Sequence, residues 1–125
     1  MNSICIFGVF VADLCFFGNK IPVKGETILG NNHIVGPGGK GSNQAIAAAR
    51  LNGNVHFITK VGDDNHADMA FSLYKEAGVN VDCIIRDPSL STGVAGIMID
   101  EDGNNAINVF AGAAKHLKSD DVDKN

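Results

Sequence analysis

The chain of 125 residues is 45% hydrophobic and 19% charged, and its formal net charge of −4 accompanies an isoelectric point near 5.4. This length suits one domain with a substantial core. The acidic balance and the scattered lysines and arginines exclude the basic surface of a nucleic-acid-binding protein, and the sequence contains no apolar run of about 18 residues that would predict a membrane-spanning helix.

Cysteine usage and the N-terminus indicate a cytoplasmic protein. The three cysteines (Cys5, Cys15 and Cys83) form no C-x-x-C pair. Two of them lie in apolar runs, so we expect buried free thiols in a reducing compartment. No basic stretch precedes the first apolar segment, which continues directly into Asp13, and we therefore expect no signal peptide.

The first expected element is a central strand. Residues 3–11 (SICIFGVFV) are apolar at both alternating sets of positions, which is typical of a strand covered on both faces in an α/β sheet. Asp13 follows this strand, and open α/β sheets bind ligands beyond the carboxyl ends of their strands. Asp13 is therefore a candidate ligand-binding residue, although an aspartate at this position is also a common strand-end cap.

The next segments alternate between extended and helical patterns. Residues 14–35 hold two extended pieces around a turn at 21–27. The alanine-rich stretch 42–52 predicts a helix that ends at Gly53, since glycine commonly follows the last helical residue. Residues 55–61 (VHFITKV) predict a second core strand.

A second helix is expected over residues 65–77. Asn65 and Asp68 have the spacing of a capping box, and Gly78 provides the stop. One face of this helix is apolar at helical spacing and should pack on the sheet; it consists of Ala67, Ala70, Phe71, Tyr74 and Ala77. Residues 79–85 predict a third strand.

A hairpin is expected from strands 92–99 and 106–110, with its turn at Asp102 and Gly103. The first arm is apolar on both faces, so it needs two partners, such as a ligand pocket and another subunit. Ser119 then begins a new helical pattern close to the last residue of the chain, and a helix this short is not stable alone. We therefore expect the chain to be the N-terminal part of something longer.

The glycine run Gly36–Asn43 (GPGGKGSN) is the strongest candidate site. Four glycines allow tight turns and close approach to a ligand, and they lead into a helix N-terminus whose free N–H groups favour anions and polar oxygens. The run fails as a P-loop, because Gly41 follows Lys40 where Ser or Thr is required. It matches G-x-G-x-x-G, but it lies too far beyond the first strand for a dinucleotide fold. An ordinary glycine-rich loop is the structural alternative.

Other chemistry-bearing residues give no site. The four histidines show no metal-ligand spacing, no nucleophile elbow is present, and Asp63 and Asp64 are most simply helix-capping residues. The sequence thus predicts an α/β domain with a polar-ligand site at Asp13 and the 39–43 turn, and it offers no catalytic or metal-ligating residue.

These motifs together resemble the ribokinase-like (PfkB-type) family of sugar kinases. The resemblance rests on the glycine turn and the alanine-rich helix that follows it, and then on the stretch from Phe57 to Asp64. Flanking motifs agree in order, from Gly8–Asp13 to Ala111–Ala113, so that the similarity extends over residues 3–117. The resemblance implies a three-layer α/β fold with a small β-sheet lid.

The resemblance also implies an enzyme that transfers the γ-phosphoryl group of ATP to a sugar hydroxyl with the help of Mg²⁺. Lid segments would lie at about 14–36 and 92–110, with Gly96 and Met98 covering the substrate. The lid of this family often pairs two subunits, so a homodimer is expected. The residues that would hold the sugar hydroxyls are Asp13, Gly39, Lys40, Gly41 and Asn43.

Two positions depart from the family pattern. Val11 stands where ribokinases usually carry Asn, which removes one amide from the sugar site, and Ala114 stands in place of a frequent Asn. The family's catalytic base, anion hole and most of its ATP site belong to a C-terminal half that is absent here, so we expect no activity from this chain alone. Alternatives are a kinase of the same fold for a nucleoside, fructose or a sugar phosphate, and a non-catalytic remnant that only dimerises. A dinucleotide-binding oxidoreductase would rest on one weak motif.

Overall fold

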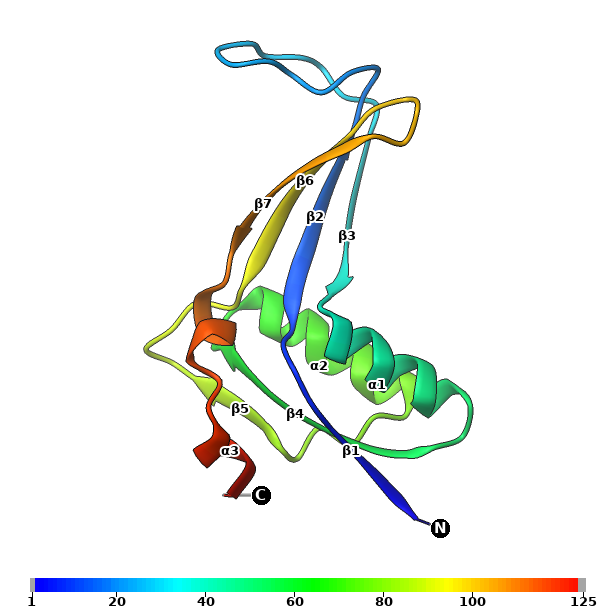
Figure 1. Ribbon diagram of the computed structural model, residues 1–125, viewed down its shortest axis with the longest axis vertical. Helices are drawn as coiled ribbons and strands as arrows, with labels where there is room; N and C mark the ends of the chain where they lie inside the picture. The colour runs from blue at the N-terminus through cyan, green and yellow to red at the C-terminus, as the bar shows by residue number, and fades with distance from the viewer. Residues whose placement is uncertain (1, 124–125) are drawn as a thin grey trace.

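The computed structural model describes residues 2–123 and contains two sheets (Figure 1). The body sheet is parallel, with the strand order β1-β4-β5, and consists of β1 (Ser3–Phe7), β4 (Asn54–Gly62) and β5 (Ile84–Asp87). The lid sheet has the order β3-β2-β6-β7 and consists of β2 (Val11–Phe17), β3 (Asn32–Gly38), β6 (Val94–Ile99) and β7 (Asn105–Phe110). The lid sheet rises from the body, and the loops at its far end form the tip of the molecule.

Alternating residues of β4 divide the body into layers. One set faces α1 (Lys40–Arg50) and α2 (Asn65–Ala77), where Phe57 and Val61 are fully buried in the main hydrophobic core. The other set includes Lys60, which contacts the short helices η1 (Gly112–His116) and α3 (Ser119–Asp123). Helices therefore lie on both sides of the body sheet, and the predicted three-layer α/β fold with a small β-sheet lid is confirmed.

The two long helices begin and end for identifiable reasons. The Asp64 carboxylate caps α2 by accepting a hydrogen bond from the Ala67 N–H, and Gly78 ends this helix with φ +92°. Asn65 is therefore the first helical residue and not the cap, whereas the helix-capping role predicted for Asp64 is confirmed. After α1 the left-handed residue is Asn52, with φ +67°, and not the predicted Gly53.

The predicted first strand is the largest error. Residues 3–11 do not form one central strand: β1 ends at Phe7, and the chain crosses to the lid sheet before β2 begins at Val11. β1 pairs with β4 alone and lies at an edge of the body sheet. Asp13 thus lies within a lid strand and not just beyond a strand of the body. The third body strand also begins later than predicted, at Ile84.

The prediction of buried thiols is wrong as well. All three cysteines are free, but Cys5 is exposed, and Cys15 and Cys83 are only half-buried. Cys5 lies on the face of β1 opposite to Ile6, which packs against the main hydrophobic core, and an apolar run cannot show which of its two faces is covered. Within residues 2–123, no helix has the length and apolar character needed to cross a membrane.

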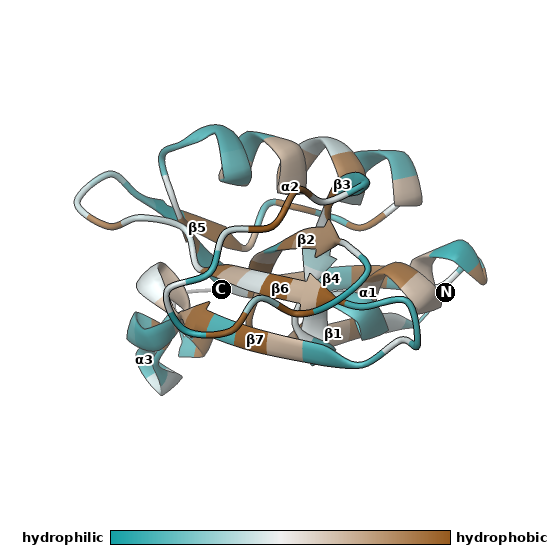
Figure 2. Cartoon of the chain, turned by 90° about the horizontal axis from the view of Figure 1, so that it is seen from above, coloured by the Kyte–Doolittle hydropathy of each residue, from teal (hydrophilic) through white to brown (hydrophobic). Residues whose placement is uncertain are grey.

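The lid sheet is the most apolar exposed part of the molecule. Hydrophobic residues run along β6 and β7, whereas the loop that joins them is hydrophilic (Figure 2). The pairing register divides the sheet into two faces, because directly paired residues share a face. Asp13 pairs with Gly36 and Ala95, and these residues define the inner face. The outer face carries Phe16, which pairs with His33 and Met98.

Candidate functional site

The structure places Asp13 directly against the glycine turn. The Asp13 side chain packs over Gly38, where a Cβ atom would lie 2.6 Å from the carboxyl carbon of Asp13 and 2.7 Å from its Oδ2. Only glycine leaves room for the carboxylate at this position. Gly38 pairs with Val11 across the two strands, so Val11 and Asp13 lie on the inner face of β2, close to this turn.

The next residue turns the chain from the lid into α1. Gly39 has φ +98°, and a Cβ atom there would collide with the carbonyl of Val9. The helix then starts at Lys40, and its first backbone hydrogen bond joins the Asn43 N–H to the Gly39 carbonyl at 3.0 Å. No side chain caps this helix, and its first turn holds no acidic residue. Such a terminus presents N–H donors to polar oxygens.

A second close approach fixes the start of α1. Gly8, in the link between β1 and β2, packs on Gly41, and a Cβ atom at either glycine would lie 2.9 Å from the Cα atom of the other. This contact holds the helix N-terminus beside the link that carries the chain to β2. The position of Asp13 relative to Lys40 and Asn43 is therefore set by backbone packing on both sides.

The electrostatics of the site centre on Asp13. Burial raises the pKa of the Asp13 carboxyl group, and no hydrogen bond or ion pair within residues 2–123 offsets that cost. Lys40 and Asn43 are exposed at the start of α1. Burial also raises the pKa of the Cys15 thiol, and the nearby Asp13 charge raises it further. A half-buried carboxylate without a partner is suited to accept hydrogen bonds from a polar ligand.

A buried hydrogen bond between α1 and α2 lies next to the 39–43 turn, and the sequence did not predict it. The hydroxyl groups of Ser42 and Tyr74 lie 2.6 Å apart and join α1 to α2. Phe10 and Phe57 contact the Tyr74 ring edge-on. Burial raises the pKa of the Tyr74 hydroxyl above its usual range, although the bond with Ser42 opposes this. Tyr74 was expected on the apolar face of α2, but no sequence signal pairs it with Ser42.

The two lid residues predicted to cover the substrate lie on the other face. Gly96 pairs with Leu14, and Met98 pairs with Phe16, so both belong to the outer face. The β6 residues that share the inner face with Asp13 are Ala95 and Ile97. The pairing register of the lid strands, which the sequence does not reveal, determines which β6 residues share a face with Asp13. The structure therefore brings together Asp13 and the 39–43 turn, but not Gly96 or Met98.

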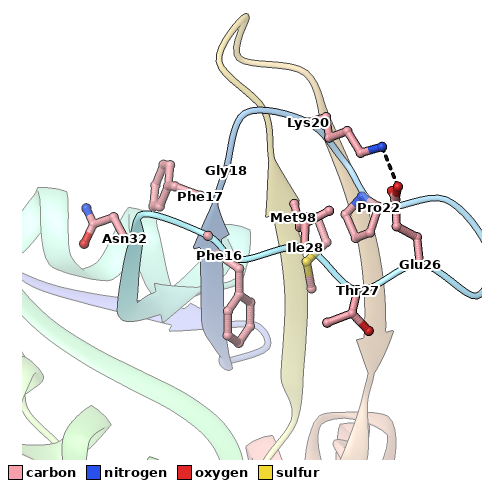
Figure 3. A pocket seen from close by; sticks show the side chains of 11 residues that line it. Phe16, Phe17, Gly18, Lys20, Pro22, Glu26, Thr27, Ile28, Asn32 and Met98 are labelled. Atoms are coloured by element: carbon pink, nitrogen blue, oxygen red, sulfur yellow. Dashed lines mark hydrogen bonds and ion pairs between the residues drawn. The ribbon is translucent and has the colours of Figure 1, made fainter.

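A cavity of about 270 Å³ lies at the tip of the lid and not at Asp13 (Figure 3). Phe16, Met98 and Ile28 provide apolar walls, and the ion pair between Lys20 and Glu26 lies at its rim. A shallow hollow of about 390 Å³ lies along α1 and includes Asn43 and Arg50. Neither of these two hollows is lined by Asp13, although the second includes Asn43 of the predicted site.

Within the described range 2–123, no group of three or more His, Cys, Asp or Glu side chains is placed to hold a metal ion.

Comparison with known proteins agrees with the geometry. Residues 1–125 match the pfkB family of carbohydrate kinases. Deoxyribokinase from Salmonella typhi is 39% identical over 122 residues, which cover 98% of this chain and 40% of the relative. Ribokinase from Bacillus subtilis (strain 168) is 41% identical over 113 residues, covering 90% of this chain and 38% of the relative.

Solved structures show the same fold. Ribokinase from Giardia lamblia is similar with a TM-score of 0.88 at 35% identity, covering 99% of this chain and 38% of its own. The Arabidopsis thaliana ribokinase complexed with ribose and ATP gives 0.83 at 30% identity, covering 97% and 41%. The chain thus spans about 40% of the length of these curated relatives.

Proposed function

The chain belongs to the pfkB family of carbohydrate kinases, and from this premise we propose that it carries the sugar-binding and lid part of a kinase that phosphorylates a sugar hydroxyl with ATP. The observation that carries the proposal is the half-buried Asp13 carboxylate, which packs over Gly38 beside the uncapped N-terminus of α1. The carboxylate would accept hydrogen bonds from two sugar hydroxyls. Lys40, Asn43 and the N–H groups at Gly39 and Gly41 would bind the others.

The contribution of these residues to phosphoryl transfer would be positional. Holding a hydroxyl in one orientation converts an encounter into a near-unimolecular step. ATP, when bound, would supply the phosphoryl group, and Mg²⁺ would stabilise the negative charge on it. We assign the catalytic base and the nucleotide site to parts of the kinase domain outside this chain, because it spans about 40% of its relatives. We therefore propose that the 125-residue chain alone does not phosphorylate sugars.

A pentose is the substrate class that we propose first, since the relatives include ribokinases and a deoxyribokinase. One observation favours a 2-deoxypentose as a second candidate. Val11 lies on the inner face near Asp13, and a valine cannot bond a hydroxyl group directed at it. A buried hydroxyl without a partner costs about 1–3 kcal/mol, so this position would discriminate against the sugar that carries it.

We also propose a cytoplasmic homodimer that forms through the outer face of the lid. Phe16, Val35 and Phe110 are 41%, 41% and 57% exposed on this face. Exposed apolar patches of this kind commonly mark protein interfaces. Light scattering measures the molar mass of the chain in solution, and a monodisperse monomer would contradict the proposed homodimer.

The test of the proposed function is the melting temperature of the chain with D-ribose, 2-deoxy-D-ribose and NAD. A sugar that binds only the folded state raises the melting temperature. We expect a rise with at least one pentose and none with NAD alone; a rise with NAD only would overturn the proposal. The Val11→Asn variant should shift the preference toward D-ribose. A coupled assay with ATP checks the expected lack of phosphorylation.

A further inference from the structure

Thr92 and Asp64 join the lid to the body through a network of hydrogen bonds. Thr92 is 2% exposed, and its hydroxyl donates to Asp64 Oδ1 at 2.6 Å. Its backbone N–H donates to Asp64 Oδ2 at 2.9 Å, and its Oγ1 accepts from the Gly62 N–H at 2.9 Å. The same carboxylate caps α2 through Ala67. We call Asp64 and Thr92 the lid anchor.

Glycines allow the segments around the lid anchor to meet without intervening side chains. A Cβ atom at Gly62 would lie 2.8 Å from the Thr92 nitrogen. A Cβ atom at Gly93 would lie 2.9 Å from Val11 Cγ1, and one at Gly112 would lie 3.0 Å from the Gly93 nitrogen. The end of β4, the start of β6 and the chain after β7 are therefore in direct backbone contact. In Figure 1, β6 and β7 leave the body beside η1, whereas β3 joins the N-terminal end of α1.

A short path leads from the lid anchor to the sugar site. The Gly93 carbonyl, next to Thr92, accepts a hydrogen bond from the Ala12 N–H at 2.8 Å. Ala12 precedes Asp13, and Asp13 pairs with Ala95 of β6. Lys40 and Asn43, in contrast, belong to the body helix α1. Besides the Gly38 and Gly8–Gly41 contacts, the attachment of β6 to the body is thus a third support for the position of the Asp13 carboxylate relative to the donors on α1.

From this geometry we infer that Asp64, acting through Thr92, is a positioning residue for the sugar site. The inference rests on the proposed function, because it concerns the distance between two sets of sugar-binding groups. Asp64 touches no substrate group itself. Its role is to fix the place where β6 leaves the body, so that Asp13 meets the sugar in the orientation set by α1.

The test compares three variants by isothermal titration with D-ribose and 2-deoxy-D-ribose. Thr92→Val keeps the side-chain shape but removes both hydrogen bonds of the hydroxyl group, to Asp64 and from Gly62, so the Kd of the bound pentose should rise about tenfold. Thr92→Ser restores the hydroxyl and should return the Kd to within about twofold. Asp68→Asn is the matched control: it breaks an ion pair to Arg86 in the first turn of the same helix, outside the lid anchor, and should leave the Kd unchanged.

Hydrogen exchange of the wild-type chain provides a second measurement, which does not depend on the folding of a variant. Coupling between sites is reciprocal, so the pentose should slow exchange at the amides of Gly62 and Thr92 as well as in β2. Protection confined to residues 11–17 and the 38–43 turn would overturn the inference. So would an unchanged Kd in folded Thr92→Val, or an equal rise in Asp68→Asn. If no pentose binds the wild type, the proposed function fails, and if it binds without this coupling, only the inference fails.

Discussion

Asp13 and Asp64 are two half-buried carboxylates at the junction of lid and body, and their surroundings differ in kind. Four hydrogen-bond donations involve Asp64 and its partner Thr92, three of them to the carboxylate itself. Although burial opposes it, these bonds lower the pKa of Asp64. Burial alone raises the pKa of Asp13, which has no such partner within residues 2–123. The Asp64 carboxylate thus stabilises the fold, whereas burial of the Asp13 carboxylate costs stability, which a ligand would recover.

The glycines beside each carboxylate show the same difference. A Cβ atom at Gly62 would meet backbone atoms of Leu90 and Thr92, which cannot move independently. The three atoms nearest to a Cβ atom at Gly38 all belong to the Asp13 carboxyl group, which can rotate away. Close packing at the lid anchor is thus enforced by the main chain, whereas at the candidate site it depends on one polar side chain.

The largest expected effect is on stability at the lid anchor. Gly62→Ala should lower the free energy of unfolding by about 3 kcal/mol, since overpacking against backbone is not relieved by side-chain motion. Gly36→Ala is the control, because a Cβ atom there meets nothing within 4 Å. Urea denaturation measures both. Equal free energies of unfolding for the two variants would contradict the view that the main chain enforces close packing at the lid anchor.

Gly38→Ala should weaken pentose binding but leave stability almost unchanged. Displacing the Asp13 carboxylate would raise the pentose Kd by about tenfold or more, while the free energy of unfolding changes by less than about 1 kcal/mol. Gly96→Ala is the control, because Gly96 lies on the outer face and a Cβ atom there would meet the Asn108 carbonyl oxygen only at 3.9 Å. Titration and urea denaturation of the same samples would separate binding from stability. A Gly38→Ala chain that binds as well as the wild type would place the sugar elsewhere.

Acid should affect the two carboxylates in opposite directions. The folded-state pKa of Asp64 lies below its ordinary value of 3.8, so its contribution is complete above that pH and is lost as the pH falls further. The folded-state pKa of Asp13 lies above 3.8, so the folded state gains stability as the pH falls through that raised value. Melting temperatures of wild type, Asp13→Asn and Asp64→Asn between neutral pH and about pH 3 test this. Parallel curves for the two variants would contradict it.

Local patterns in the sequence predicted much of the fold. Helical spacing located α1 and α2, the Asp102-Gly103 turn located the hairpin, and motif order indicated the family that the comparisons confirm. The division of residues 3–11 was missed because the segment is apolar throughout. Its break depends on Gly8 packing against Gly41, a contact between distant parts of the chain.

The candidate site was predictable in its residues but not in its geometry. Asp13 and the glycine turn were found from residue type and order, and the structure brings them together. Gly96 and Met98 were predicted to cover the substrate, and the strand register, which local sequence patterns do not give, places both on the face of the lid opposite to Asp13. The Asp64–Thr92 and Ser42–Tyr74 contacts join segments far apart in the sequence, and composition or spacing carries no trace of them.

The central claim is that the unpaired Asp13 carboxylate binds the sugar. Isothermal titration of D-ribose and 2-deoxy-D-ribose into the wild type and Asp13→Asn tests it most directly. We predict that the wild type binds one of these pentoses and that the variant binds it at least about 100-fold more weakly, since bonds to a charged acceptor are each worth about 1.5–3 kcal/mol. Its melting temperature without sugar should be equal or higher. A pentose Kd that is the same in both proteins would contradict the account.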